Sequence, residues 1–203
     1  MSIPFQDSET AKNLLRAFAG ESQARNRYDF AANLCQKQEL QAMAFIFQAT
    51  AKQEQAHAKV FWDHLQALNG QNLPIYGAYP IEGTNRILEL LRAAQHNEHE
   101  EHGSVYPSFA AIATQEGFPE AAASFRQIAA IEQLHGERFG LLADQLESGA
   151  LFVSQIETGW MCLNCGHTQN SLEAPKQCPV CNHGQGWFIR LELAPWSPVV
   201  KQK

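Results

Sequence analysis

Residues 54 to 57 read EQAH, and residues 132 to 135 read EQLH. In each stretch a glutamate and a histidine are three positions apart, which places both side chains on the same face of an α-helix. Each pair also lies on an apolar helical stripe, the first one turn before Phe61 and the second one turn before Phe139. Two such pairs on buried helix faces indicate a helical bundle that holds metal ions at its centre.

Apolar residues recur at helical spacing over residues 8–148, a segment rich in Ala, Glu, Gln and Leu. We expect Asn69-Gly70 to end the second helix and Thr84 to cap the third. Pro107 should kink the third helix rather than end it, because the apolar period resumes beyond it. The expected helices span residues 8–36, 39–68, 84–116 and 119–147.

The connection between the second and third helices is long and rich in turn residues, whereas the other two connections are short. It reads NGQNLPIYGAYPIEG over residues 69–83. One long crossover between two antiparallel hairpins is the topology of ferritin-like bundles. The sequence therefore predicts a mainly α fold. Its parts are a ferritin-like four-helix bundle over residues 1–148, a linker over 149–156 and a small metal-bound β domain over 157–203.

Each expected helix carries a carboxylate in the middle of its apolar stripe. On the third helix, a rotation of about 100° per residue turns Glu98 and Glu101 inward, whereas His96, His99 and Glu100 face solvent. A buried carboxylate costs several kcal/mol unless it is protonated, paired or bound to a metal. A Glu on two helices plus Glu-x-x-His on the other two is the dinuclear carboxylate pattern. The candidate ligands are Glu21, Glu54, His57, Glu98, Glu101, Glu132 and His135.

Basic residues on these stripes are too few to neutralise the acids, and Arg25 is the clear candidate for pairing. Carboxylate oxygens mixed with imidazole nitrogens suit iron or manganese. We interpret Cys35 as a small core residue and His102 as a partly exposed or outer group. Tyr28 and Tyr106 are either core aromatics or hydrogen-bond donors to metal-bound species.

Four of the five cysteines form two C-x-x-C pairs in the last quarter of the chain. Two such knuckles can place four thiolates around one ion, and a disulfide is not expected in a reducing compartment. The spacing does not choose between structural zinc and a one-electron iron site. A dinuclear centre that must be re-reduced favours iron. The ligands are Cys162, Cys165, Cys178 and Cys181.

The charge pattern argues against two classes of partner. The formal net charge is −6, and no basic stripe is present, so nucleic acid and anionic membranes are disfavoured. No apolar run approaches the roughly 20 residues of a membrane span, and the first residues do not resemble a signal peptide. We therefore expect a cytoplasmic protein.

Several segments, in this order, resemble the rubrerythrin family. They include AFAGESQARNRY at 17–28, VYPSFAAIA at 105–113, IEQLHGERF at 131–139 and APKQCPVC at 174–181. The resemblance implies a di-iron centre in a ferritin-like bundle, followed by a rubredoxin-like domain with one iron on four cysteines. It also implies reduction of hydrogen peroxide.

The resemblance further implies a role for each ligand. Glu101 and His57 would exchange on one iron as its oxidation state changes, and Tyr28 or a nearby carboxylic acid would supply protons. No role is implied for His102, because the family often has a tyrosine and another acid after the second glutamate. The ligands that stay in place would be the bridging Glu54 and Glu132, the terminal Glu21 and Glu98, and His135.

The expected activity is a non-haem di-iron peroxidase that protects against oxidative stress, with hydrogen peroxide as substrate. A partner such as rubredoxin or an NAD(P)H-dependent reductase would supply electrons, because no G-x-G-x-x-G motif marks a nicotinamide site. The alternatives are a ferroxidase of the ferritin-like class and a metal-binding protein with zinc in the tail. A homodimer or higher homo-oligomer is expected.

Overall fold

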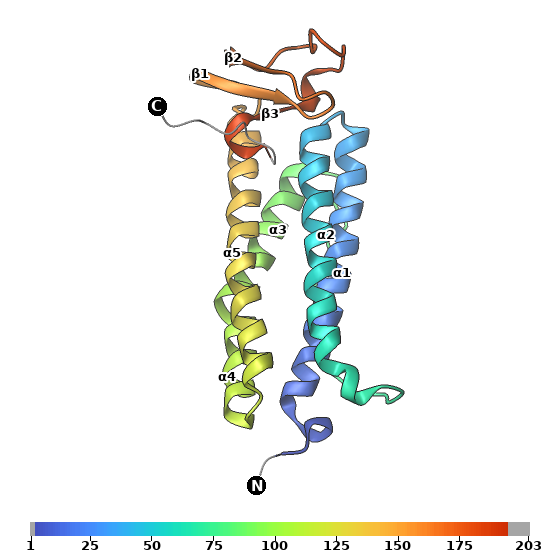
Figure 1. Ribbon diagram of the computed structural model, residues 1–203. Helices are drawn as coiled ribbons and strands as arrows, with labels where there is room; N and C mark the ends of the chain where they lie inside the picture. The colour runs from blue at the N-terminus through green and yellow to red at the C-terminus, as the bar shows by residue number, and fades with distance from the viewer. Residues whose placement is uncertain (1–2, 195–203) are drawn as a thin grey trace.

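The structure is a computed structural model that describes residues 3–194, and the last part of the expected second domain lies outside these residues. Two helical hairpins pack side by side in an elongated bundle, as predicted (Figure 1). One hairpin pairs α1 with α2, and the other pairs α3 and α4 with α5. The helices are α1 (Glu9–Lys37), α2 (Gln41–His64), α3 (Ile87–Glu100), α4 (Tyr106–Glu116) and α5 (Pro119–Glu147).

The third expected helix is interrupted by a π-helical turn, Glu101–Val105, between α3 and α4. Pro107 explains the interruption, because proline has no N–H to donate to the carbonyl four residues earlier. The Tyr106 N–H instead bonds the Glu101 carbonyl, which is the i to i+5 pattern of a π-turn. The prediction that the helix continues through Pro107 is confirmed. The sequence pattern did not indicate the wider turn.

The third helix begins later than expected, so the prediction that Thr84 caps it is wrong. Its N-cap residue is Arg86, which has no side-chain capping bond. Thr84 lies just outside the helix, where its hydroxyl accepts from the Arg86 N–H at 3.1 Å and donates to Glu89 at 2.5 Å. Thr84 therefore holds the residues just before α3 in place.

The crossover segment, residues 69–86, is bound along α1. Arg16 donates from Nε to the Tyr76 carbonyl at 2.9 Å, and Tyr79 donates its hydroxyl to the Arg16 carbonyl at 2.9 Å. Further along, Arg27 makes two hydrogen bonds to Glu82, at 2.7 and 2.8 Å. These contacts hold the crossover over one face of the bundle.

The buried apolar side chains of the bundle form two clusters. The first includes Tyr28, Phe47 and Phe139, whose ring centroids lie 5.0 to 5.9 Å apart. The second includes Tyr106, Phe61 and Phe125, with centroids 5.1 to 6.0 Å apart. The two clusters keep water away from the polar layer at the centre of the bundle.

The cysteine-rich domain packs on the end of the bundle formed by the α1–α2 turn (Figure 1). Its antiparallel sheet has the order β2-β1-β3 and contains β1 (Val153–Cys162), β2 (Thr168–Glu173) and β3 (Phe188–Arg190). A methyl group at Gly186 would lie 1.7 Å from the Glu39 carbonyl oxygen, so this close approach requires glycine. β1 begins within residues 149–156, the segment expected to be a linker.

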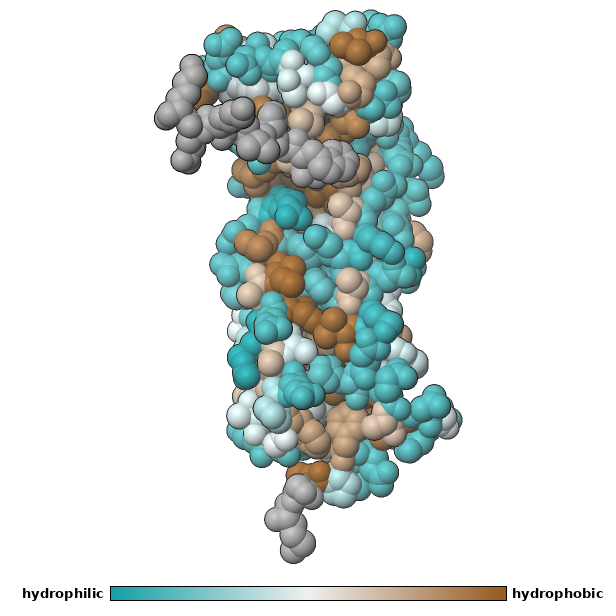
Figure 2. All heavy atoms as spheres, in the orientation of Figure 1, coloured by the Kyte–Doolittle hydropathy of each residue, from teal (hydrophilic) through white to brown (hydrophobic). Residues whose placement is uncertain are grey.

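The surface seen in Figure 2 is largely hydrophilic, with an apolar band across its middle, over α5 and α2. On α5 the exposed apolar side chains include Ile131, Leu134 and Leu141. Within residues 3–194, no helix is both long enough and apolar enough to cross a membrane.

Glu116, at the end of α4, caps the beginning of α1. Its carboxylate accepts from the backbone N–H of Glu9 at 3.0 Å and from the N–H of Thr10 at 2.8 Å. We expect Glu116→Ala to lower the free energy of unfolding by roughly 1–2 kcal/mol, because it leaves two helix-end donors without their partner. Urea unfolding of equally metal-loaded proteins measures this. Gln115→Ala, at an exposed neighbour, is the control, and an equal loss there would contradict the capping role.

Candidate metal centres

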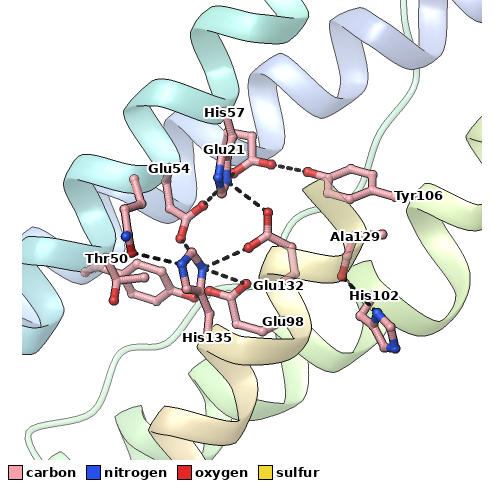
Figure 3. Close-up of polar contacts among 12 residues, drawn as sticks. Glu21, Thr50, Glu54, His57, Glu98, His102, Tyr106, Ala129, Glu132 and His135 are labelled. Carbon is pink, nitrogen blue, oxygen red and sulfur yellow. Dashed lines mark hydrogen bonds and ion pairs between the residues drawn. The ribbon is translucent and has the colours of Figure 1, made fainter. Parts of the chain in front are cut away.

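Six of the predicted ligands converge at the centre of the bundle, from four helices (Figure 3). All six are buried, and the most exposed of them, His57, has only 7% of its surface accessible. They form two groups of four whose ligand atoms lie within 4.8 Å of one another, and both groups contain Glu54 and Glu132. The first group adds Glu21 and His57, and the second adds Glu98 and His135.

The two shared carboxylates each turn one oxygen toward each histidine. His57 Nδ1 lies 3.0 Å from Glu54 Oε2 and 2.9 Å from Glu132 Oε1. His135 Nδ1 lies 3.0 Å from Glu54 Oε1 and 2.8 Å from Glu132 Oε2. A carboxylate that turns one oxygen toward each of two neighbouring positions can bridge two ions. The remaining glutamates lie farther out, with Glu21 Oε2 at 3.9 Å from His57 and Glu98 Oε2 at 3.8 Å from His135.

The chemistry of this layer fits two cations. Several of its buried atoms lack a hydrogen bond of good geometry, including both carboxylate oxygens of Glu132 and Nδ1 of His135, although they lie close to one another as ion pairs. Such atoms cost about 1–3 kcal/mol each when unsatisfied, and more when charged. Hard oxygens and imidazole nitrogens around two adjacent positions suit a di-iron centre.

In the absence of metal, bound protons neutralise part of the negative charge of this layer. Burial and the neighbouring Glu54 hold the pKa of Glu21 well above its usual range. Burial by itself would lower the pKa of His135, but the Glu132 and Glu54 carboxylates, which accept from its ring N–H, outweigh burial and raise the pKa to about 12. The same balance raises the pKa of His57 to about 9. Metal binding therefore displaces protons from these groups.

The outer glutamates are held by tyrosines. Tyr28 donates its hydroxyl to Glu98 Oε1, and Tyr106 donates to Glu21 Oε1. Burial, followed by the adjacent carboxylates, raises the pKa of both phenols well above the usual value, so both hydroxyls keep their protons. Both tyrosines are thus core aromatics that donate hydrogen bonds to candidate ligands. Donation to a metal-bound species stays a prediction.

Gln53 orients one histidine. His135 Nε2 lies 3.0 Å from Gln53 Oε1, and a proton on Nε2 leaves the Nδ1 lone pair free to face the cluster. The sequence analysis missed Gln53, because a glutamine one position before a ligand gives no spacing signal.

Glu101 lies at the edge of the layer rather than inside it. It starts the π-turn, is only half-buried, and belongs to neither group of four. Burial and then the charges of Glu98 and Glu132 raise its pKa well above the usual value, while Arg27 opposes the shift. In this structure His57 contacts both shared carboxylates.

Most side chains outside the metal layer lie where the sequence predicts them. His96, His99 and Glu100 are exposed, as predicted, and Cys35 is fully buried in the core, as predicted. Arg25, the candidate for pairing with the buried acids, is exposed and lines a groove between α1 and α2, so this candidate is wrong.

His102 is half-buried, and its Nδ1 lies 2.8 Å from the Ala129 carbonyl oxygen of α5 (Figure 3). It thus joins the π-turn to α5.

The four cysteines of the second domain surround one point. The Sγ atoms of Cys162 and Cys181 are 3.7 Å apart, and those of Cys165 and Cys178 are 3.6 Å apart. An ion bound at about 2.3 Å in a tetrahedron of sulfurs would place them roughly 3.8 Å apart, whereas a disulfide is about 2 Å long. The four thiolates therefore fit a single tetrahedral ion.

The two knuckles share one backbone pattern. Cys162 N–H bonds the His167 carbonyl, and Cys178 N–H bonds the His183 carbonyl, both at 2.8 Å. The residue after the second cysteine of each pair has a left-handed backbone, at Gly166 and Asn182. The backbone of each knuckle thus turns its two cysteines toward the same point.

Comparisons with known proteins agree with both sites. Residues 12–143 match the family described as Rubrerythrin, and residues 160–189 match the one described as Rubrerythrin, rubredoxin-like domain. A rubrerythrin of Porphyromonas gingivalis is 44% identical, over 93% of this chain and 92% of its own length. A rubrerythrin of Nitratidesulfovibrio vulgaris is 40% identical, over 92% and 96%.

Solved structures give the same fold. A structure described as fully reduced nigerythrin, all ferrous, superposes with a TM-score of 0.61 at 25% identity, over 94% of this chain and 88% of its own. A bacterioferritin of Mycobacterium tuberculosis superposes with a TM-score of 0.61 at 18% identity, over 70% and 88%, which shows the fold alone. With the rubredoxin-like match, the four-cysteine cluster fits an iron site.

Proposed function

Because the chain belongs to the rubrerythrin family, whose di-iron proteins are oxidoreductases, we propose that it is a peroxidase that reduces hydrogen peroxide to water. The reaction breaks one oxygen–oxygen bond and consumes two electrons and two protons. When bound, the di-iron centre supplies the two electrons and stabilises the developing charge. The protein provides the ligands, the proton donors and the exclusion of water.

One observation carries the proposal: a single chain contains both a buried carboxylate–histidine layer for two ions and a tetrathiolate site for one. A tetrathiolate iron carries one electron at a time. A centre that gives up two electrons per peroxide needs such a supply to work repeatedly. A ferroxidase takes its electrons from the Fe(II) that it oxidises, so it needs no tetrathiolate site to supply them.

The proposed ligands are the six converging side chains, with Glu101 as a seventh that replaces His57 when the centre changes oxidation state. Its place at the edge of the layer supports this role, because the half-buried carboxylate can move without disturbing the bridging pair. Tyr28 keeps its proton on Oη beside Glu98 and is the candidate proton donor.

Electrons from the tetrathiolate site must cover a long distance within one chain. The stretch of α1 from Glu21 to Lys37 alone separates the cluster from the domain end of the bundle by roughly 24 Å, at about 1.5 Å per residue. We therefore propose that a second copy, in a homodimer or larger homo-oligomer, brings its cysteine domain close to this cluster. The exposed apolar residues of α5 offer a surface for that contact.

We further propose an external electron donor, either a rubredoxin-like protein or an NAD(P)H-dependent reductase, and a cytoplasmic location in which the thiolates stay reduced. Hydrogen peroxide removal by iron-loaded protein, with a reductase and NADH, tests the function. We expect catalytic removal that depends on the donor. Little donor-dependent removal, together with stoichiometric consumption of added Fe(II), would instead identify a ferroxidase.

A further inference from the structure

A pocket of about 300 Å³ lies between α1, the π-turn and the crossover segment. Its inner wall includes Glu101 and Tyr106, and Gly20 lines it one residue before Glu21. Its outer wall is the crossover, from Gly77 to Pro80. The pocket therefore connects the surface with the side of the carboxylate layer where Glu101 lies.

Tyr79 belongs to the outer wall and reaches across to α1. A methyl group at Gly20 would lie 3.6 Å from Tyr79 Cε1, and one at Gly77 would lie 3.1 to 3.2 Å from the ring and hydroxyl. The ring is thus seated between two backbone segments that have no side chain there. The hydrogen bond from its hydroxyl to the Arg16 carbonyl, at 2.9 Å, holds it in this position.

The charges around the pocket favour a neutral ligand. Arg27 is bound to Glu82, and Arg16 is bound to Glu9 and, at 2.6 Å, to Asn13. Both guanidinium groups are therefore already paired. The exposed Glu100 adds a carboxylate to the lining, which would repel an anion.

We propose that this pocket is the path by which peroxide reaches the carboxylate layer, and that Tyr79 restricts it to hydrogen peroxide and small, uncharged alkyl hydroperoxides. The volume is several times the roughly 30 Å³ that a water molecule occupies in the liquid, so a short alkyl group can be accommodated. The role of the path rests on the proposed peroxidase function.

The reduction of an alkyl hydroperoxide balances in the same way as the reduction of hydrogen peroxide. Breaking the oxygen–oxygen bond to give an alcohol and a water needs two protons and two electrons, and the two ferrous ions would supply the electrons when bound. Apolar walls such as Val105 and Phe109 would contact the alkyl group. Tyr79 acts on selectivity and takes no part in the electron transfer.

Rapid mixing of the reduced, iron-loaded protein with hydrogen peroxide or tert-butyl hydroperoxide tests the proposal. In Tyr79→Ala the rate constant for the alkyl hydroperoxide, relative to that for hydrogen peroxide, should rise by about tenfold, the scale of steric selection in an apolar pocket. Ala78→Trp, which adds bulk at the exposed mouth, should lower the ratio by about as much. Tyr79→Phe, which loses only the tether, should lie between wild type and Tyr79→Ala.

Ile81→Trp is the matched control, because Ile81 is 96% exposed on the same crossover and does not line the pocket. The rate of nitric oxide binding to the reduced centre gives a second measurement that involves no turnover, and it should fall in Ala78→Trp but not in Ile81→Trp. Unchanged peroxide ratios and nitric oxide rates in all pocket variants would overturn the proposal. If peroxide fails to oxidise even the wild type, the peroxidase function is wrong, and the nitric oxide rates still decide whether the pocket is the path.

Discussion

Cys162→Ser should abolish donor-dependent peroxide turnover while leaving the first oxidation of pre-reduced protein intact. Cys162 is fully buried and supplies one of the four thiolates, so its loss removes the one-electron site without touching the bundle. Turnover should fall to the rate seen without donor, because the di-iron centre can no longer be re-reduced. Steady-state assays and a single anaerobic mixing experiment measure the two parts separately. Normal repeated turnover in this variant would show that electrons do not pass through the tetrathiolate site.

Mixed oligomers then distinguish transfer within a chain from transfer between chains. Cys162→Ser keeps the bundle ligands, and Glu132→Ala keeps the four cysteines. Co-expression of the two chains should restore part of the turnover that each lacks alone if electrons pass between subunits. No restoration in oligomers shown to contain both chains would assign the transfer to a single chain.

Glu101→Ala should leave di-iron binding largely intact and lower the rate of peroxide reduction by roughly 100-fold or more, because the proposed replacement for His57 is missing and even groups that only orient metal ligands contribute about 10–100-fold. The reason is geometric. The two groups of converging ligands are complete without Glu101, which lies half-buried at their edge. Iron content and the rate of single-turnover oxidation measure the two effects.

His96→Ala, at an exposed position on the same helix, is the control for this variant and should change neither quantity. Glu101→Gln keeps the size of the side chain but weakens its binding to iron, so it should resemble the alanine variant. Wild-type rates in both Glu101 variants would refute the exchange with His57. A loss of both irons would instead make Glu101 a permanent ligand.

The sequence predicted most of the fold because the apolar period and the turn residues agree with one another. The fourth helix, residues 119–147, matches the structure, since Pro119 and Gly149 mark its ends by simple backbone chemistry. The start of the third helix was misplaced, because Thr84 has the chemistry of a cap but accepts from the N–H of Arg86, the residue before the helix begins. The π-turn was missed, because a wheel of constant rotation has no means of representing a wider turn.

The candidate site was likewise predicted from the sequence only in part. The six converging ligands could be found because a carboxylate in an apolar stripe is costly, and four stripes showed the same anomaly. Gln53, the two tyrosine contacts and the pocket beside Glu101 depend on which side chains of distant segments meet. Tyr79 in particular lies in a turn-rich crossover without periodicity, so only the folded chain brings it over Gly20.

The most direct test of the central claim, that both metal sites serve one peroxide reaction, is a titration of fully reduced, iron-loaded protein with hydrogen peroxide. Three ferrous ions per chain hold three electrons, so the end point should lie at about 1.5 peroxides per chain, with the red colour of the oxidised tetrathiolate iron restored. An end point of about one peroxide per chain, with the tetrathiolate iron still reduced and colourless, would contradict the account.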